Sequence, residues 1–138
     1  MMKTNFFSLM VILALIIFSC SDDDNNSPAL SGKWHLQTIE YFECPTATDN
    51  RVLECGTSGN FASCHDYTFN GGYYTIKYLS SSIESEGQYT ITGNKIKFPD
   101  GTSSFKEFEF TQSGNTLVMI KLGTGSSACR EKYTYVKM

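Results

Sequence analysis

The sequence predicts an all-β domain: an eight-stranded antiparallel up-and-down β-barrel that follows an N-terminal signal peptide. Short runs in which apolar and polar residues alternate recur every 8 to 12 residues or so, a spacing typical of antiparallel strands. Turn-forming Gly and Asn residues separate these runs. No window carries the spacing of an amphipathic helix, so we expect strands throughout the folded part.

The first run predicts a long, bent strand. Trp34 and Leu36 share one face of an extended chain, whereas Ile39 and Tyr41 have the opposite parity. A bulge shifts parity by one residue and bends the strand that contains it. We therefore expect a β-bulge near residues 37–38.

The other seven expected strands are shorter and alternate regularly. They are centred on residues 67–69, 74–78, 89–91, 96–98, 108–110, 117–122 and 133–135. The run 117–122 is apolar on both faces, which predicts either a covered outer face or a contact patch there.

The connections between the runs differ in length in a regular way. Long connections are expected at residues 43–63, 80–86 and 123–128, and tight turns at residues 70–72, 92–94 and 113–115. Because alternate connections of a meander lie at alternate ends, all the long loops fall at one end. This asymmetry favours a closed barrel with one open mouth, and an open two-layer sandwich is the structural alternative.

The N-terminus has the pattern of a secretory signal peptide. Lys3 precedes an apolar run over residues 6–18, which is shorter than the roughly 18 to 20 residues of a membrane-spanning helix. Ser19 followed by Cys20 resembles a bacterial lipobox. That resemblance implies cleavage by signal peptidase II and acylation of Cys20, with palmitate among the acyl groups. A plain signal peptide and an N-terminal membrane anchor are the alternatives.

An acidic segment follows Cys20. Residues 21–24 resemble the export signal of Bacteroidetes surface lipoproteins, which implies an outer-membrane, lipid-anchored protein on the cell surface. A solvated tether is the simpler interpretation, and both can hold together. We therefore divide the chain into a lipoprotein signal peptide (1–19), an acidic tether (20–29) and a β-barrel domain (30–138). The first strand starts at the tight-turn end, so the membrane anchor is expected at the closed end.

Composition argues against several functions. One of the 11 basic residues precedes Cys20, so 10 basic residues remain against 14 acidic ones, a net charge of −4. The basic residues form no run, which argues against nucleic acid as a partner. His35 and His65 belong to no metal-binding pattern, and no Gly-x-Ser-x-Gly elbow is present. We expect no metal, no cofactor and no catalytic activity.

Four cysteines remain after Cys20, an even number that predicts two disulfides in an exported chain. Cys44, Cys55 and Cys64 belong to the first long connection or its edges, and Cys129 lies beside the last strand. The first and last strands become neighbours when the barrel closes, so all four cysteines are expected at the mouth. The preferred pairing is Cys64–Cys129 with Cys44–Cys55, and the other two pairings remain open.

Residues 30–34, with the sequence LSGKW, resemble the Gly-x-Trp motif of lipocalins. The chain from residue 30 to 138 is similar to the lipocalin-like domains that many Bacteroidetes lipoproteins carry. The resemblance implies that Trp34 packs across the closed end of the barrel. It also implies that Gly32 lets the chain approach this ring closely.

Ten aromatic residues are expected to point into the barrel: Tyr67, Phe69, Tyr74, Tyr78, Tyr89, Phe98, Phe108, Phe110, Tyr133 and Tyr135. Our candidate ligand-binding residues are Tyr67, Tyr74, Tyr78, Tyr89, Phe108 and Tyr133. One hypothesis is a cavity that binds a small hydrophobic ligand. The alternative is a filled barrel, a non-enzymatic interaction module whose disulfide-pinned loops contact a protein or glycan.

Overall fold

The computed structural model describes residues 29–55, 63–82, 84–101, 103–121 and 128–138. Within these ranges the chain forms ten strands and one short 3-10 helix. In chain order they are β1 (Gly32–Phe42), η1 (Ala47–Asp49), β2 (Arg51–Glu54), β3 (His65–Asn70), β4 (Tyr73–Tyr78), β5 (Glu84–Gln88), β6 (Thr90–Thr92), β7 (Lys95–Asp100), β8 (Ser104–Ser113), β9 (Thr116–Lys121) and β10 (Arg130–Lys137).

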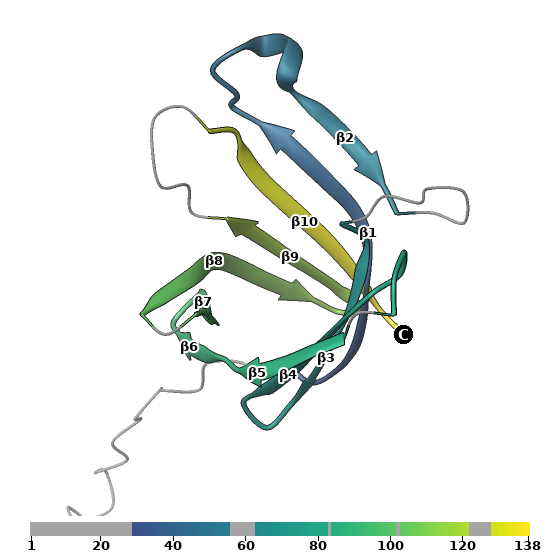
Figure 1. The fold of residues 1–138 in the computed structure, drawn as a ribbon, viewed down its shortest axis with the longest axis vertical. Helices are drawn as coiled ribbons and strands as arrows, with labels where there is room; N and C mark the ends of the chain where they lie inside the picture. Colours follow the sequence, from purple (N-terminus) through teal and green to yellow (C-terminus); the bar gives the residue numbers. More distant parts are fainter. Residues whose placement is uncertain (1–28, 56–62, 83, 102, 122–127) are drawn as a thin grey trace, which may run out of the picture.

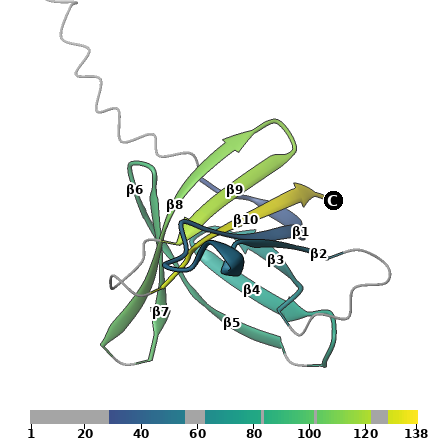
Figure 2. The ribbon, with the colours of Figure 1, turned by 90° about the horizontal axis from the view of Figure 1, so that it is seen from above.

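All pairings are antiparallel and belong to one sheet in the order β5-β4-β3-β1-β10-β9-β8-β7-β6, with β2 paired to β1. The two ends of this order, β5 and β6, are consecutive in the chain with only Tyr89 between them. The sheet therefore curls into a nearly closed barrel (Figures 1 and 2). The expected antiparallel β-barrel is confirmed, and it is nearly closed.

The expected count of eight strands is wrong. One expected strand is divided into two, and one expected loop contains a strand. The strand expected at residues 89–91 is divided into β5, which pairs with β4, and β6, which pairs with β7. Strand β2 lies inside the expected loop at residues 43–63 and pairs with the far half of β1. Both strands are short and carry little apolar alternation, so the pattern of apolar residues does not reveal them.

The bulge in β1 is confirmed. The register of β1 against β10 shifts between Leu36 and Thr38. The carbonyl of Gln37 accepts a hydrogen bond of 2.7 Å from the backbone N–H of Cys55. Before the bulge β1 pairs with β3, and after it β1 pairs with β2, while β10 pairs with both halves. Strands β1, β2 and β10 thus continue past the rest of the barrel (Figure 1).

The closed end is packed around Trp34, which is fully buried. Its indole Nε1–H donates to the carbonyl of Ser31 at 3.1 Å. Gly32 has a φ of 87°, and a Cβ there would lie 3.0 Å from the Cε of Lys137. The Lys137 ammonium lies 5.5 Å from the centre of the Trp34 ring. A residue other than glycine would be strained at this close approach of the first and last strands.

Two disulfides are present among the described residues, which confirms their predicted number. The preferred pairing is wrong: the bonds join Cys44 to Cys129 and Cys55 to Cys64. Cys44 and Cys129 lie just beyond Phe42 and Arg130, the last residue pair of β1 and β10.

Strand β2 explains the other bond. It runs back along β1 and returns the chain to the level of the bulge, where the backbone of Cys55 meets Gln37. Cys64 directly precedes β3, which pairs with the part of β1 before the bulge. The hairpin of β1 and β2 therefore brings together two cysteines that an unstructured loop would leave apart.

We predict that the two disulfides differ in their resistance to reduction. Cys55 and Cys64 are 4% and 1% exposed, whereas Cys44 and Cys129 are both half-buried. A thiol reductant must reach a sulfur atom, so the Cys44–Cys129 bond should be reduced first under native conditions. Timed reduction, alkylation and peptide mass spectrometry will measure this order. Earlier or equal labelling of Cys55 and Cys64 would contradict the burial argument.

Candidate functional site

The candidate site consists of two adjoining hollows in the wall of the barrel, of about 190 Å³ and 210 Å³. Five side chains line both of them: Tyr67, Ile76, Tyr78, Lys106 and Phe108. Each hollow is smaller than the roughly 300 to 1,000 Å³ of typical small-molecule pockets, but their combined volume falls in the lower part of that range. The barrel interior at this level is therefore not completely filled by side chains.

The first hollow is also lined by His65, Lys121, Tyr133 and Tyr135. The second is also lined by Tyr74, Ser85, Phe98, Pro99 and Asp100. These residues come from β3, β4, β5, β7, β8, β9 and β10, so no single hairpin builds the site. Aromatic rings and a few polar groups make the wall, a composition typical of small-molecule sites.

The floor of the hollows is an aromatic cluster centred on Phe98. Its ring lies 5.4 Å from the ring of Tyr67 in a stacked arrangement and 5.0 Å from that of Tyr74 in an edge-to-face one. It also contacts the rings of Phe69, Tyr89 and Phe108. Such aromatic pairs add about 0.5–1.5 kcal/mol each beyond their burial. The cluster closes the interior below the hollows.

Five of the six candidate ligand-binding residues line the hollows: Tyr67, Tyr74, Tyr78, Phe108 and Tyr133. Tyr89 lines neither one. Its ring packs edge-to-face on Phe69 at 5.2 Å, and its hydroxyl donates to the carbonyl of Leu30 at 3.1 Å. Tyr89 thus belongs to the core at the closed end, because it sits where the chain crosses from β5 to β6.

Tyr74 is held over the backbone of the neighbouring strand. A Cβ on Gly87, its partner in β5, would lie 2.9 Å from the Tyr74 ring. Real Cβ atoms almost never come that close, so only glycine lets the ring lie across β5. Gly87 therefore sets the position of one wall of the second hollow.

Sequence reasoning missed several residues of the wall: His65, Lys106, Lys121 and, as a binding residue, Tyr135. The alternation of side chains along a strand could have identified the two lysines. Lys106 has the parity of Phe108, and Lys121 has the parity of Met119, so both point inward at the rim. A lysine at the rim can bury its stem along apolar surface and keep its ammonium near water.

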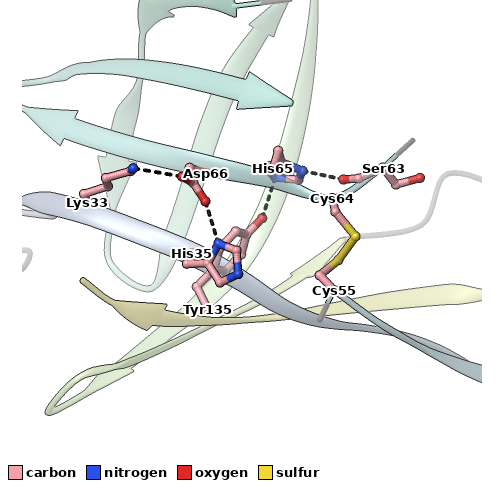
Figure 3. Close-up of polar contacts among 8 residues, drawn as sticks. All are labelled: Lys33, His35, Cys55, Ser63, Cys64, His65, Asp66 and Tyr135. Atoms are coloured by element: carbon pink, nitrogen blue, oxygen red, sulfur yellow. Dashed lines mark hydrogen bonds and ion pairs between the residues drawn. A yellow bond between two sulfur atoms is a disulfide. The ribbon is translucent and has the colours of Figure 1, made fainter. Parts of the chain in front are cut away.

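His65 is buried on the inner face of β3 and makes two hydrogen bonds (Figure 3). Its Nδ1 lies 2.6 Å from the carbonyl oxygen of Ser63, and its Nε2 lies 3.0 Å from the hydroxyl of Tyr135. A carbonyl only accepts, so Nδ1 carries the proton and Nε2 accepts from Tyr135. Burial lowers the pKa of His65, against the smaller raising effects of Ser63 and Asp66. The ring is therefore neutral at pH 7.

Asp66, the next residue, belongs to a separate cluster on the outer face. Its carboxylate lies 2.7 Å from Nδ1 of His35 and 3.0 Å from Nζ of Lys33, both on β1 (Figure 3). Burial alone would raise the pKa of Asp66, but the hydrogen bonds and charges of His35 and Lys33 outweigh it and lower the pKa. Successive residues of a strand face opposite sides, so His65 and Asp66 are not one site.

The rim of the first hollow carries a short polar chain. Nζ of Lys121 donates to Glu131 at 2.9 Å, and the hydroxyl of Tyr133 donates to the same carboxylate. Burial and then the neighbouring Glu131 raise the pKa of Tyr133. On the neighbouring strands β8 and β7, Lys106 pairs with Asp100 at 3.5 Å. The mouth of the barrel is thus polar, while its depth is aromatic.

The described ranges offer neither a metal site nor a membrane-spanning helix. They contain no group of three or more His, Cys, Asp or Glu side chains that could hold a metal ion. In the same part of the chain, no helix has the length and apolar character needed to cross a membrane.

An antiparallel barrel with an aromatic-lined hollow at one end defines a ligand-binding type of fold. A family model described as a lipocalin-like domain matches residues 30–119, and the chain belongs to this family. Its fold generally serves binding rather than catalysis. Strand β10 lies beyond the matched residues but pairs with β1 and β9. The comparisons with curated proteins and with solved structures returned no match.

We predict that acidification destabilises the protein through His65. The pKa of His65 is below its ordinary 6.5 in the folded chain, so only the unfolded chain gains this proton as the pH falls through 6.5. Its contribution to stability is therefore full above pH 6.5 and declines below it. The contribution of Asp66 to stability is lost only when the pH falls near and below 3.8, the ordinary pKa of its carboxyl group.

The measurement is the urea midpoint between pH 8 and pH 5. His65→Gln should flatten the decline over this range, because glutamine keeps hydrogen-bonding groups but does not titrate. His35→Gln, on the outer face, is the matched control and should keep the part of the decline that His65 causes. An unchanged pH dependence in the His65 variant would contradict this account.

Proposed function

We propose that this protein is a non-enzymatic binding protein that holds a small hydrophobic ligand in the hollows at the open end of its barrel. The observation that carries the proposal is the unfilled space bounded by Tyr67, Tyr78 and Phe108. Elsewhere the interior is closed, since Trp34 and Leu36 are fully buried and line neither hollow. The two hollows thus combine aromatic walls with an opening at the rim.

The size and chemistry of the hollows support a compact apolar ligand. A small barrel has room for its own side chains or for one small ligand, and here the Phe98 cluster occupies the lower part. The remaining space suits a body of one or two rings. The alternative, a filled barrel whose loops contact a protein or glycan, is less well supported because these hollows exist.

The binding test compares two substitutions on the same strand, monitored with the fluorescent two-ring amine 1-aminonaphthalene. Phe108→Trp should fill the hollows and lower the affinity at least about 10-fold, since the pocket volume is lost. Phe105→Trp is the matched control, because Phe105 is 65% exposed on β8 and lines neither hollow. Unsaturable binding, or an equal effect of both variants, would contradict the proposal.

We further propose that the protein is a lipoprotein, acylated at Cys20 and carried to the outer surface of the outer membrane. The support is the signal-like run at residues 6–18, the Ser19–Cys20 junction and the acidic residues 21–24. Leu30 is buried at the closed end, against Tyr89. A tether that leads there would attach the closed end to the membrane and leave the mouth facing outward.

The anchor is tested by growing a Bacteroidetes host with an alkynyl analogue of palmitate. The full-length chain should become labelled, and Cys20→Ala should abolish the label because no mature N-terminal cysteine remains. Replacing Asp22, Asp23 and Asp24 by Ala is the control for sorting: it should keep the label but reduce cleavage by external protease on intact cells. A label that persists in Cys20→Ala would contradict acylation at this residue.

A further inference from the structure

The hydroxyl of Tyr67 belongs to a largely buried side chain and has no hydrogen-bond partner in the described part of the chain. The residue is only 8% exposed, and its ring stacks on Phe98. Its hydroxyl has no hydrogen bond to any residue that the structure describes, although every fully enclosed side-chain N or O atom in those ranges has a partner. The Tyr67 oxygen must therefore border open space, and the space that Tyr67 lines is the pair of hollows.

Three other interior tyrosines differ from Tyr67 because their hydroxyls have protein partners. The hydroxyls of Tyr89, Tyr133 and Tyr135 each donate to a protein acceptor. Tyr78, which lines both hollows beside Tyr67, has no such hydrogen bond among the described residues. Tyr67 and Tyr78 thus line the same hollows, and neither hydroxyl has a partner within the described ranges.

These hydroxyls are available as hydrogen-bond donors. Burial, and then the neighbouring Tyr74 and Tyr78, raise the pKa of Tyr67, so its hydroxyl keeps its proton. The ring nitrogens of His65 are already engaged, one donating to Ser63 and the other accepting from Tyr135. No free imidazole nitrogen is left on this wall to accept from a ligand.

Lys106 is a third hydrogen-bond donor beside the hydroxyls of Tyr67 and Tyr78. It lines both hollows together with Tyr67 and Tyr78, and an ammonium only donates. Its ion pair with Asp100 is 3.5 Å long, and both side chains are about half exposed, so the pair is weak. Lys121, the other rim lysine, is held at 2.9 Å by Glu131. Lys106 is therefore the rim cation that a ligand can engage most readily.

We propose that the hydroxyls of Tyr67 and Tyr78 and the ammonium of Lys106 form a carboxylate-binding subsite. The ligand is then a small apolar carboxylate whose body packs against Ile76 and Phe108. This inference rests on the proposed function and names the chemical class of its ligand. Charge-assisted hydrogen bonds in a partly buried site are the stronger kind, so the carboxylate is the group that best uses these three donors.

The test compares two probes of equal size, 2-naphthoate and 2-ethylnaphthalene, by titration of the naphthalene emission. The carboxylate should bind at least about 10-fold more tightly than the hydrocarbon, as expected for hydrogen bonds to a charged group. Tyr67→Phe and Lys106→Met should each weaken 2-naphthoate about 10-fold and leave 2-ethylnaphthalene within about twofold. Both variants keep the apolar part of the side chain, and a cooperative thermal transition checks that they fold.

Matched controls lie on the outer side of β4. Tyr73 is 57% exposed, its hydroxyl accepts from Gln88, and Lys77 is exposed on the same strand. Tyr73→Phe and Lys77→Met should change neither affinity. Equal binding of the two probes, or a Tyr67→Phe effect that is the same for both, overturns the subsite and leaves the hydrophobic pocket standing. Binding of neither probe overturns both proposals.

Discussion

The stacking of Tyr67 on Phe98 determines how the interior of this barrel is divided. The two residues lie on β3 and β7, which share no hydrogen bonds, so their contact spans the interior. Below them the rings of Phe69 and Tyr89 continue the packing toward Trp34. Above them the wall opens into the hollows. A small barrel has too little volume for a full core and a ligand, and this contact sets the boundary between the two.

The bulge at Gln37 governs the other end of the molecule. It ends the pairing of β1 with β3 and starts the pairing of β1 with β2, so the extra hairpin begins at the rim of the barrel. The Cys55–Cys64 bond lies at this level, and the Cys44–Cys129 bond lies at the far end of the extension. One covalent link therefore fixes the rim, and the second closes the end of the arm that β1, β2 and β10 form.

Much of this architecture could be predicted from local pattern. The parity change between Leu36 and Ile39 indicates the bulge, and the alternating aromatic residues indicate the inner face. Patterns of this kind report what each strand buries. They do not reveal the pairing of strands that bury few apolar side chains. Strand β5, with the sequence ESEGQ, is such a strand. Its partner β4 defines it, because a strand without apolar alternation is recognised only by its hydrogen bonds.

The disulfide pairing and the polar part of the site depend on long-range geometry. Four cysteines allow three pairings, and the hairpin of β1 and β2 decides among them. His65 and Lys106 are 41 residues apart in the sequence and meet only because β3 and β8 face the same interior. The position of a lysine in an alternating strand indicates whether its side chain points inward. Which carboxylate pairs with its ammonium depends on the strands that the folded barrel brings together.

The most direct test of this account is a high-resolution crystal structure of the domain from residue 30 onward. The rings of Tyr67 and Phe98 should stack, and ordered water or a bound molecule should lie within hydrogen-bonding distance of the Tyr67 hydroxyl, in the space beside Tyr78 and Phe108. Side chains turned inward to fill that space, with the Tyr67 hydroxyl bonded to a protein atom, would contradict it.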